Sequence, residues 1–213
     1  MKNVIIACAG GYGVEAYLEM MNVNAHYAER GREEPFHFLG FLSDIPVDLE
    51  SQGIHEKILG TIDEWQPSED EYFFIGLSRP DQKKAVADRL VPKGARFISI
   101  VSPYAFVSDY AKIGDGCLVT GGSKISWGVE IGNFVNVNSS LLQSGTKVGD
   151  FSTTTAFAIL EGCELGTGVF VGTKAVITDG CHIGDWAQVY VGSVVMQDVE
   201  PGISVFGMPA KRM

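Results

Sequence analysis

The sequence predicts two folds in one chain: a Rossmann-like α/β domain over residues 1–98 and a parallel β-helix over residues 99–213. In the first part, apolar runs of strand length alternate with helical patterns, which favours a small parallel sheet with crossover helices. From about Val101 onward, aliphatic residues recur at every sixth position. Six-residue units, taken three per turn, are typical of a triangular β-helix with tight turns at its corners. A β-sandwich would instead show period-two alternation.

The first domain begins with an apolar strand from Asn3 to Ala9, which runs into a glycine loop. The helix that follows the loop has apolar residues at the i, i+3, i+4, i+7 spacing of an amphipathic helix, namely Val14, Tyr17, Leu18 and Met21.

Two further strands and one further helix complete the predicted domain. The second strand runs from Phe36 to Leu42 and the third from Tyr72 to Leu77. The second helix begins near Ser78-Arg79-Pro80 and ends before Pro92 and Gly94, since proline favours the first turn of a helix and glycine its end.

The repeat of the second domain has one irregularity. A glycine follows the aliphatic residue at Ile113, Ile131, Val148, Leu165 and Ile183, and these positions are 18, 17, 17 and 18 residues apart. The coil on each side of Val148 is therefore one residue short. A shortened turn changes which side chains point outward and can shape a groove, although a solenoid also tolerates such slips without functional consequence.

Composition narrows the classes of function. The chain has 213 residues, 46% of them hydrophobic, and no apolar run approaches the roughly 18 residues that span a bilayer. Its N-terminus lacks the layout of a signal peptide, so we expect a cytoplasmic protein with no membrane insertion. The net charge of −10 disfavours nucleic acid as a partner. The four cysteines show no metal-ligand spacing, so we expect reduced thiols and no bound metal.

Five segments resemble the bacterial sugar acyltransferases of the NeuD/PglD type, which are part of the hexapeptide-repeat acyltransferases. They are ACAGGYGVE, GFLSD, FFIGL, SPYAFVSDYAKIGDG and the C-terminal VFGMPAKRM, so the resemblance runs nearly end to end. It implies a homotrimer with a left-handed β-helix, an exception to the usual right-handed crossover. It also implies transfer of an acetyl group from acetyl-CoA to an amine or hydroxyl of a sugar, commonly a nucleotide-linked one in polysaccharide or glycan synthesis.

The resemblance implies two sets of binding residues. The nucleotide sugar would be held by the glycine loop and the ends of the next two strands, at Gly10, Gly11, Tyr12, Gly13, Ser43, Asp44 and Gly76. The acyl-CoA would lie along the β-helix and the C-terminal segment, at Gly172, Gly192, Pro209, Ala210 and Lys211.

The residues themselves leave alternatives open at both sets. The loop fits a dinucleotide fingerprint, and a nucleotide sugar suits the small sheet better than NAD, but such glycines also pack strand against helix. Asp44 is placed to bind a ribose or base, or is a surface turn. Lys211 and Arg212 supply the local positive charge that a CoA phosphate requires, or form a basic solvated tail.

The catalytic base of the family is missing. Acyl transfer from a thioester needs a group that accepts the proton of the attacking amine or hydroxyl, usually histidine. The family places this histidine at the position of Ser144, and no histidine occurs between His55 and His182. Tyr12, Ser43 and Ser102 also depart from the family's usual residues.

Counting four residues back from each aliphatic-glycine pair places Glu161 in one column with Ser144. Neighbouring coils lie about 4.8 Å apart, so our hypothesis is that the Glu161 carboxylate replaces the base, through Ser144 or a water molecule. A solvated turn acid is the alternative. His182 lies in a second column that is charged in every coil, so we expect it to face solvent.

The sequence therefore predicts an acetyl-CoA-dependent sugar acetyltransferase with Ser144 and Glu161 as candidate catalytic residues. Two alternatives remain. One is a catalytically silent relative that binds a nucleotide sugar or serves as an assembly partner. The other is an acyltransferase that needs no protein base, because positioning alone accelerates thioester aminolysis.

Overall fold

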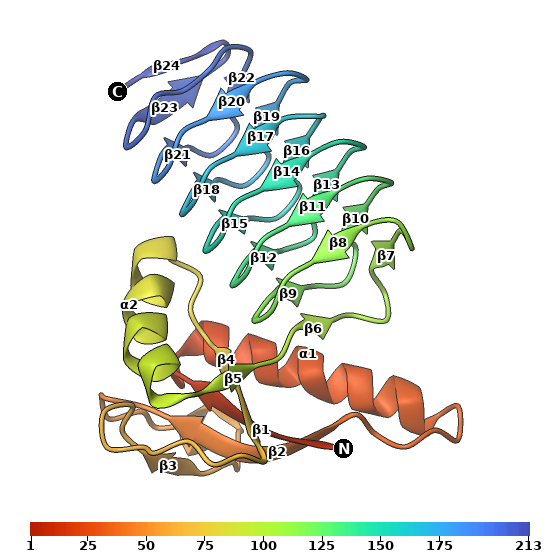
Figure 1. The fold of residues 1–213 in the computed structure, drawn as a ribbon, viewed down its shortest axis with the longest axis vertical. Helices are drawn as coiled ribbons and strands as arrows, with labels where there is room; N and C mark the ends of the chain where they lie inside the picture. The colour runs from red at the N-terminus through yellow and green to blue at the C-terminus, as the bar shows by residue number, and fades with distance from the viewer. The chain divides into compact units, whose positions relative to one another are not determined.

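A computed structural model describes residues 1–213, which divide into two compact units (Figure 1). The first unit consists of residues 1–78 and 82–100, and the second of residues 79–81 and 101–213. Each is described by itself below.

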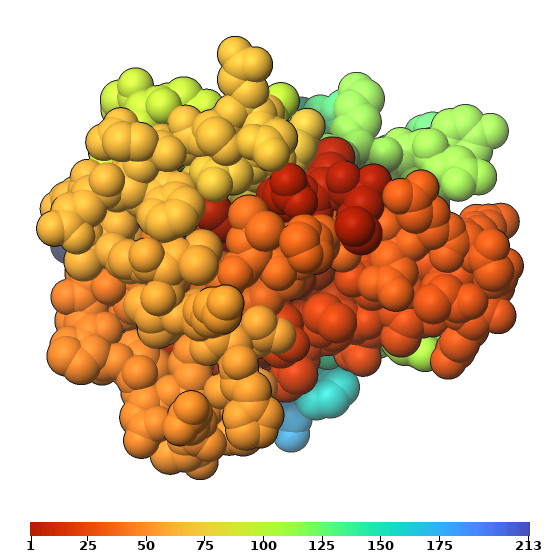
Figure 2. All heavy atoms as spheres, turned by 90° about the horizontal axis from the view of Figure 1, so that it is seen from below, coloured from red at the N-terminus to blue at the C-terminus, as the bar shows by residue number.

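The first unit contains a five-stranded sheet of order β3-β2-β1-β4-β5, and every strand pair in it is parallel. Its strands are β1 (Lys2–Ala7), β2 (Phe36–Leu42), β3 (Ile58–Gly60), β4 (Glu71–Ile75) and β5 (Arg96–Phe97). In Figure 2 the red N-terminal residues lie between orange and yellow segments, as expected when the first strand is central. The three longer strands were predicted from their apolar runs. The strands β3 and β5 were not predicted, because three and two residues carry no readable pattern.

This unit contains the helix α1 (Gly11–Ala28) and, from Gln82 onward, the helix α2 (Pro80–Leu90), with short 3-10 turns η1 (Glu50–Gln52) and η2 (Val91–Lys93). The helix predicted from the apolar spacing is confirmed, but that spacing does not mark its buried face, since Leu18 and Met21 are exposed. The buried face consists instead of Gly13, Ala16, Met20, Val23 and Asn24. Small side chains at the start of this face let the helix approach the sheet closely, so size decides the orientation more than hydrophobicity does.

The second unit is a prism of three sheets, one for each face, whose strands pair in parallel except for the final β23–β24 pair, and this fits the left-handed parallel β-helix that we expected. We call the faces A, B and C. Face A contains β6 (Ile100–Val101), β9 (Leu118–Val119), β12 (Asn136–Val137), β15 (Thr153–Thr154), β18 (Phe170–Val171), β21 (Gln188–Val189), β23 (Ser204–Gly207) and β24 (Ala210–Arg212). Face B contains β7 (Phe106–Val107), β10 (Lys124–Ile125), β13 (Leu141–Leu142), β16 (Ile159–Leu160), β19 (Val176–Ile177) and β22 (Val194–Val195). Face C contains β8 (Lys112–Ile113), β11 (Glu130–Ile131), β14 (Lys147–Val148), β17 (Glu164–Leu165) and β20 (His182–Ile183).

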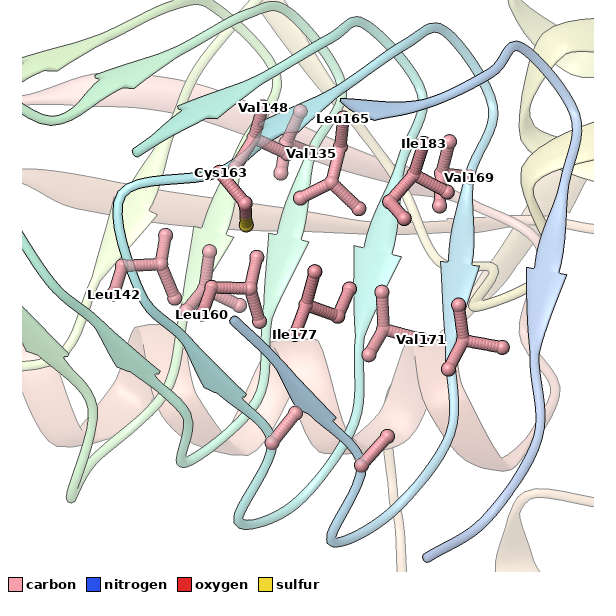
Figure 3. Packing of buried hydrophobic residues seen from close by; sticks show 14 of the residues in the cluster. Val135, Leu142, Val148, Leu160, Cys163, Leu165, Val169, Val171, Ile177 and Ile183 are labelled. Carbon is pink, nitrogen blue, oxygen red and sulfur yellow. The ribbon is translucent and has the colours of Figure 1, made fainter. Parts of the chain in front are cut away.

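The second residue of nearly every strand points into the prism and stacks on its counterpart in the next coil (Figure 3). On face B, for example, Leu142, Leu160 and Ile177 pair in sequence and are fully buried. This confirms the six-residue repeat. Each inward side chain contacts the coil above and the coil below instead of water, so the core is one continuous apolar column.

The two missing residues lie at corners, not in strands. The spacing from Val137 on face A to Leu142 on face B is five residues, and so is the spacing from Leu160 on face B to Leu165 on face C. The strands on either side stay in register, with Ile131 opposite Val148. The short corners are therefore residues 138–140 and 161–163.

The corners between faces C and A are closed by side chains that bond to the next coil. Asp150 Oδ1 accepts the backbone N–H of Asn133 at 2.7 Å, and Asp185 Oδ1 accepts that of Thr167 at 2.8 Å. The rings of Phe134 and Phe151 stack with their centroids 4.9 Å apart. These contacts connect the turns of neighbouring coils, which lie outside the hydrogen-bonded strands.

We predict that Ile177→Ala lowers the free energy of unfolding by about 2–5 kcal/mol, because the coils on both sides hold a fixed spacing and cannot close the cavity. Urea unfolding followed by circular dichroism measures this change. The control is Val191→Ala, at a corner position that is 57% exposed, which should change stability by about 0.5 kcal/mol or less. Equal effects at the two positions would contradict a tightly packed column.

Candidate functional site

The glycine loop places the start of α1 at the carboxyl end of β1. Cys8 adopts a left-handed φ of 77°, and Gly10 precedes the helix without a side-chain cap. The first intrahelical bond runs from Val14 N to Gly10 O, and no acidic residue lies in the first turn. Backbone N–H groups and the positive end of the helix dipole therefore meet at Gly10 and Gly11, which suits an anion such as phosphate.

The loop glycines divide into two kinds. A Cβ at Gly13 would lie closer than 3.0 Å to the Cys8 carbonyl oxygen, and a Cβ at Gly76 would lie 2.6 Å from both that oxygen and Gly13 Cα. A Cβ at Gly10 or Gly11 would meet no atom within 4 Å. Gly13 and Gly76 are thus required by packing, whereas Gly10 and Gly11 border open space. The packing interpretation therefore holds for Gly13 and Gly76 but does not account for Gly10 and Gly11.

The strand order explains why these residues meet. The chain goes from β1 to β2 on one side and later returns to place β4 on the other side of β1. Open parallel sheets bind ligands outside the carboxyl ends of the strands at such a switch point. Here the two strands end at Ala7 and Ile75, and the backbone N–H of Gly76 donates to Ala7 O at 2.7 Å.

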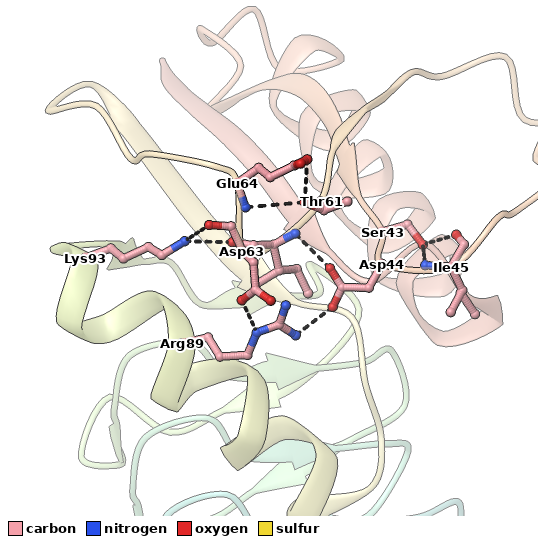
Figure 4. Close-up of polar contacts among 9 residues, drawn as sticks. Ser43, Asp44, Ile45, Thr61, Asp63, Glu64, Arg89 and Lys93 are labelled. Carbon is pink, nitrogen blue, oxygen red and sulfur yellow. Dashed lines mark hydrogen bonds and ion pairs between the residues drawn. The ribbon is translucent and has the colours of Figure 1, made fainter.

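The Asp44 carboxylate is held by contacts within its own unit (Figure 4). Its Oδ1 accepts the backbone N–H of Ile62 at 2.9 Å, and its Oδ2 accepts Arg89 Nη1 at 2.6 Å. Arg89 also donates from Nε to Asp63 at 2.8 Å. The hydrogen bond from Arg89 holds the pKa of Asp44 below its usual range. These contacts account for Asp44 without a ligand.

Neighbouring polar residues have similar local roles. The Ser43 hydroxyl donates to the carbonyl of Ile45 at 2.7 Å, which closes the turn after β2. Lys93 donates its ammonium to a ring of backbone carbonyls in one loop, those of Ile62, Asp63 and Trp65. Burial raises the pKa of the Cys8 thiol to about 11, and the Asp44 charge adds to this effect. Cys8 is therefore a thiol and not a nucleophile at neutral pH.

One group near the loop was missed by the sequence analysis. Tyr17, two turns into α1, packs on Phe38 with ring centroids 4.7 Å apart and donates its hydroxyl to Glu56 at 2.7 Å. Burial and the bond to Glu56 raise the pKa of Tyr17 to about 12. The bond anchors residues 54–57 to the helix. The only signal for this group in the sequence is the place of Tyr17 in the apolar spacing of the helix.

The hydroxyl-rich segment around the first short corner is a structural ladder. Ser140 Oγ donates to the carbonyls of Asn138 and Thr155, and Ser139 Oγ donates to Gly121 O at 2.8 Å. Thr155 Oγ1 donates to Val171 O at 2.9 Å. These hydroxyls satisfy corner carbonyls between coils, so they are not candidate nucleophiles.

Ser144 lies at the corner between faces B and C and is exposed. The prediction that Glu161 stacks in its column is wrong. The backbone N–H of Gln143 bonds to Leu160 O and that of Glu161 to Ile177 O, so Glu161 is level with Gln143. The missing residue falls between Glu161 and Leu165, so counting back from Leu165 assigned the wrong column. Gly162 takes the place next to Ser144.

The second predicted column is confirmed as a solvent-facing ladder of alternating charge along face C. Lys112 Nζ lies 2.7 Å from Glu130 and Lys147 Nζ lies 2.5 Å from Glu164, while His182 Nδ1 lies 3.4 Å from Glu164. The lysine neighbours lower the pKa of both glutamates. His182 is therefore part of an exposed ion-pair ladder, as its column predicts.

The residues expected to bind acyl-CoA lie along the last coils. Pro209, Ala210 and Lys211 belong to the C-terminal hairpin of β23 and β24 and line a cavity of about 760 Å³ at the end of the prism. The other lining residues include Val195, Val199, Ile203 and Arg212. Gly192 borders open space with φ 66°, whereas a Cβ at Gly172 would collide with the next coil at Tyr190 and Val191. Gly172 is thus fixed by packing.

No three or more His, Cys, Asp or Glu side chains are grouped so that they could hold a metal ion, and none of the four cysteines forms a disulfide. Neither helix combines the length and the apolar character needed to cross a membrane.

Solved structures of known proteins share this fold, from the glycine loop through the β-helix to the C-terminal hairpin. The chain has the fold of the sugar acetyltransferases of the hexapeptide-repeat family, whose solved structures it matches along its whole length. These structures are 18–21% identical to it, so the likeness is one of fold. No family profile matches the sequence.

Two of these structures illustrate the likeness. PerB from Caulobacter crescentus, solved with CoA and GDP-perosamine, is 19% identical, with 100% of this chain and 98% of that chain covered and a TM-score of 0.85. The acetyltransferase domain of PglB from Neisseria gonorrhoeae is 20% identical, with both chains fully covered and a TM-score of 0.82, and was also solved with acetyl coenzyme A.

A curated relative gives a local match. The bifunctional protein GlmU of Gluconacetobacter diazotrophicus is 31% identical over 105 residues, which are 40% of this chain and 23% of that protein. The chain spans about a quarter of the length of the curated relatives it matches.

We predict that Gly13→Ala and Gly11→Ala have opposite effects on stability. Alanine at Gly13 forces a shift of the Cys8 carbonyl, so we expect a loss of about 2 kcal/mol or more in unfolding free energy. Alanine at Gly11 meets open space at the start of α1 and should be neutral or stabilising by up to about 1 kcal/mol. Chemical denaturation of both variants measures the difference, and equal losses would disprove the division of the loop.

Proposed function

We propose that the protein is an acetyl-CoA-dependent acetyltransferase that acts on an amine or hydroxyl of a nucleotide-linked sugar. The observation that carries this proposal is the match along the whole chain to PerB, which was solved with both CoA and a nucleotide sugar. The open N-terminus of α1 supports it within this chain, because it offers backbone N–H groups to a diphosphate.

In this proposal the Rossmann-like domain of residues 1–98 binds the nucleotide sugar. Gly10 and Gly11 contact its phosphates through their backbone, and Tyr12 lies beside them. Gly13 and Gly76 keep strand and helix close enough to form the site, which is an indirect role. Ser43 and Asp44 hold the turn after β2 in place, since their polar atoms are occupied by protein groups.

The β-helix of residues 99–213 binds acetyl-CoA in this proposal. Lys211 and Arg212 supply positive charge for its phosphates in a chain whose net charge is −10. Pro209, Ala210 and Gly192 leave room for the cofactor beside them, and Gly172 shapes the backbone of the preceding coil. The reaction would take place in the cytoplasm, where acetyl-CoA and activated sugars are available, and would serve polysaccharide or glycan synthesis.

The chemistry requires two things of the protein, a base for the acceptor's proton and orientation of the two substrates. The acceptor nitrogen or oxygen attacks the thioester carbonyl, the C–S bond breaks, and the acceptor's proton must reach a base before CoA leaves as a thiol. Orientation of both substrates lowers the barrier by itself. Ser144 lies where the family places its histidine, and its hydroxyl can relay a proton but cannot retain it.

A second candidate function is that of a nucleotide-sugar-binding relative without turnover. The exposed Ser144, with no histidine at its corner, favours this reading. The two candidates differ in one respect: an enzyme must bind the acyl donor productively, whereas the silent relative need not bind it at all.

A homotrimer is also part of the proposal. In four strands of face B the second residue is buried inside the prism and the first residue is on the outer side. These outer residues form an apolar stripe of Leu141, Ile159, Val176 and Val194. Each is half-buried in the single chain. A continuous apolar stripe on a β-helix suits contact with other copies of the same chain.

We predict that the protein releases free thiol from acetyl-CoA only when a suitable nucleotide amino sugar is present. A thiol-reactive dye and a panel of nucleotide sugars test this, with each parent hydroxyl sugar as the matched control. Thermal stabilisation by a nucleotide sugar but not by acetyl-CoA, without thiol release, would favour the silent binder instead.

We predict that Ile159→Glu converts the trimer to monomers, because three like charges would meet in an apolar contact. Size-exclusion chromatography with light scattering measures the mass. The control is Lys124→Glu, a charged residue on the same face that is already exposed. A wild-type protein that is monomeric at micromolar concentration would disprove the assembly.

A further inference from the structure

The second unit contains a cavity of about 190 Å³ beside face A. Phe170 and Gln188 are the outward residues of β18 and β21 and pair directly with each other in the sheet. A cavity of this size holds one small ring and is too small for a nucleotide or CoA. All of its lining residues belong to the second unit, and they are Arg79, Pro80, Asp81, Gly168, Phe170, Trp186 and Gln188.

Trp186 is the lining residue that the fold explains least. It lies at the corner between faces C and A, where the chain adopts a left-handed φ of 57° at Phe134, 62° at Phe151 and 60° at Trp186. A bulky side chain in this conformation strains the backbone. Phe134 and Phe151 offset this strain by stacking on each other, but the coil between Phe151 and Trp186 has only Gly168 at this corner. Trp186 therefore bears the strain without a ring partner.

The absence of a side chain at Gly168 fixes the position of the indole. A Cβ at Gly168 would lie closer than 3.0 Å to three carbon atoms of the six-membered ring of Trp186. The ring thus packs on the glycine backbone and lines the cavity, while the side chain remains 37% exposed. The indole N–H donates to no protein acceptor, and the half-buried Gln188 amide has no protein partner. Two hydrogen-bonding groups of the cavity are therefore unused by the fold.

The charged residues of the cavity favour a neutral ligand that carries several hydroxyl groups. Arg79 Nε lies 3.4 Å from Asp81 Oδ1, and both side chains are more than half exposed. Asp81 would repel an anion and Arg79 would repel a cation, whereas each hydroxyl group of a sugar can accept from one and donate to the other. The aromatic side chains of Trp186 and Phe170 supply apolar surface for the C–H groups of a sugar ring.

We propose that this cavity binds the pyranose ring of a neutral monosaccharide. The indole of Trp186 contacts the sugar ring, and Gln188, Arg79 and Asp81 bind its hydroxyl groups. The site is separate from the proposed acetyl transfer, because none of its residues belongs to the glycine loop, the C-terminal hairpin or the corner that carries Ser144. The protein therefore binds a free sugar when neither acetyl-CoA nor a nucleotide is present.

Saturation-transfer NMR on the intact protein tests this site, with the methyl glycosides of glucose, galactose and N-acetylglucosamine titrated at millimolar concentration. We expect at least one glycoside to bind, and we expect no binding of sorbitol, which has the hydroxyl groups but no ring. Trp186→Ala and Gln188→Ala should each weaken binding on the order of tenfold. Trp127→Ala is the matched control, since it removes an exposed tryptophan that does not line the cavity, and it should bind like the wild type.

The outcomes decide the proposal without reference to acetyl transfer. Failure of all three glycosides to bind the wild-type protein would overturn it. Unchanged binding by Gln188→Ala and Trp186→Ala would also overturn it, because the sugar would then bind elsewhere. Binding of uracil or benzoate in place of the glycosides would assign the cavity to a flat ring instead. Circular dichroism verifies the fold of each variant, and Trp186→Phe, which keeps a ring, should retain more binding than Trp186→Ala.

Discussion

Hydrogen bonding between successive coils is the constraint on which the C-terminal unit depends. Each two-residue strand is too short to be stable alone, and it persists because its backbone bonds to the coils on both sides while one side chain enters the common core. Inside the strands, an inserted or deleted residue would turn the aliphatic side chain outward and a polar one inward. Length changes are therefore confined to corners. The two short corners of this chain follow this rule, since the strands beside them keep their pairing.

The same constraint makes corners the place where function can vary. A deleted corner residue costs the core nothing, but it shifts every side chain between the deletion and the next strand. At residues 161–163 the shift moves Glu161 away from Ser144 and puts a glycine in its place. The Asp179 side chain of the following coil lies against this glycine, and the core column stays intact.

Sequence reasoning succeeded where spacing is strict and failed where it slips. The inward column, the solvent-facing charged column and the existence of two short coils follow from counting residues, because the core tolerates only one register. The column of Glu161 could not be counted correctly, since the position of a deletion within a coil leaves no mark on the aliphatic spacing. The buried face of α1 was missed for a different reason: Leu18 and Met21 are more apolar than Gly13 and Ala16, but only the small pair fits against β1.

In each of the two units, glycine stands where two segments of the chain approach each other too closely for a side chain. In the N-terminal unit, Gly13 and Gly76 bring helix and strands together so that the open backbone of Gly10 and Gly11 stands at the sheet's edge. In the β-helix, Gly162 lets a carboxylate lie across a neighbouring coil. At Gly10 and Gly11 the missing side chain leaves open space, and at Gly162 it leaves room for the Asp179 side chain. In both units, therefore, the absence of a side chain at one position decides how closely two backbone segments can approach.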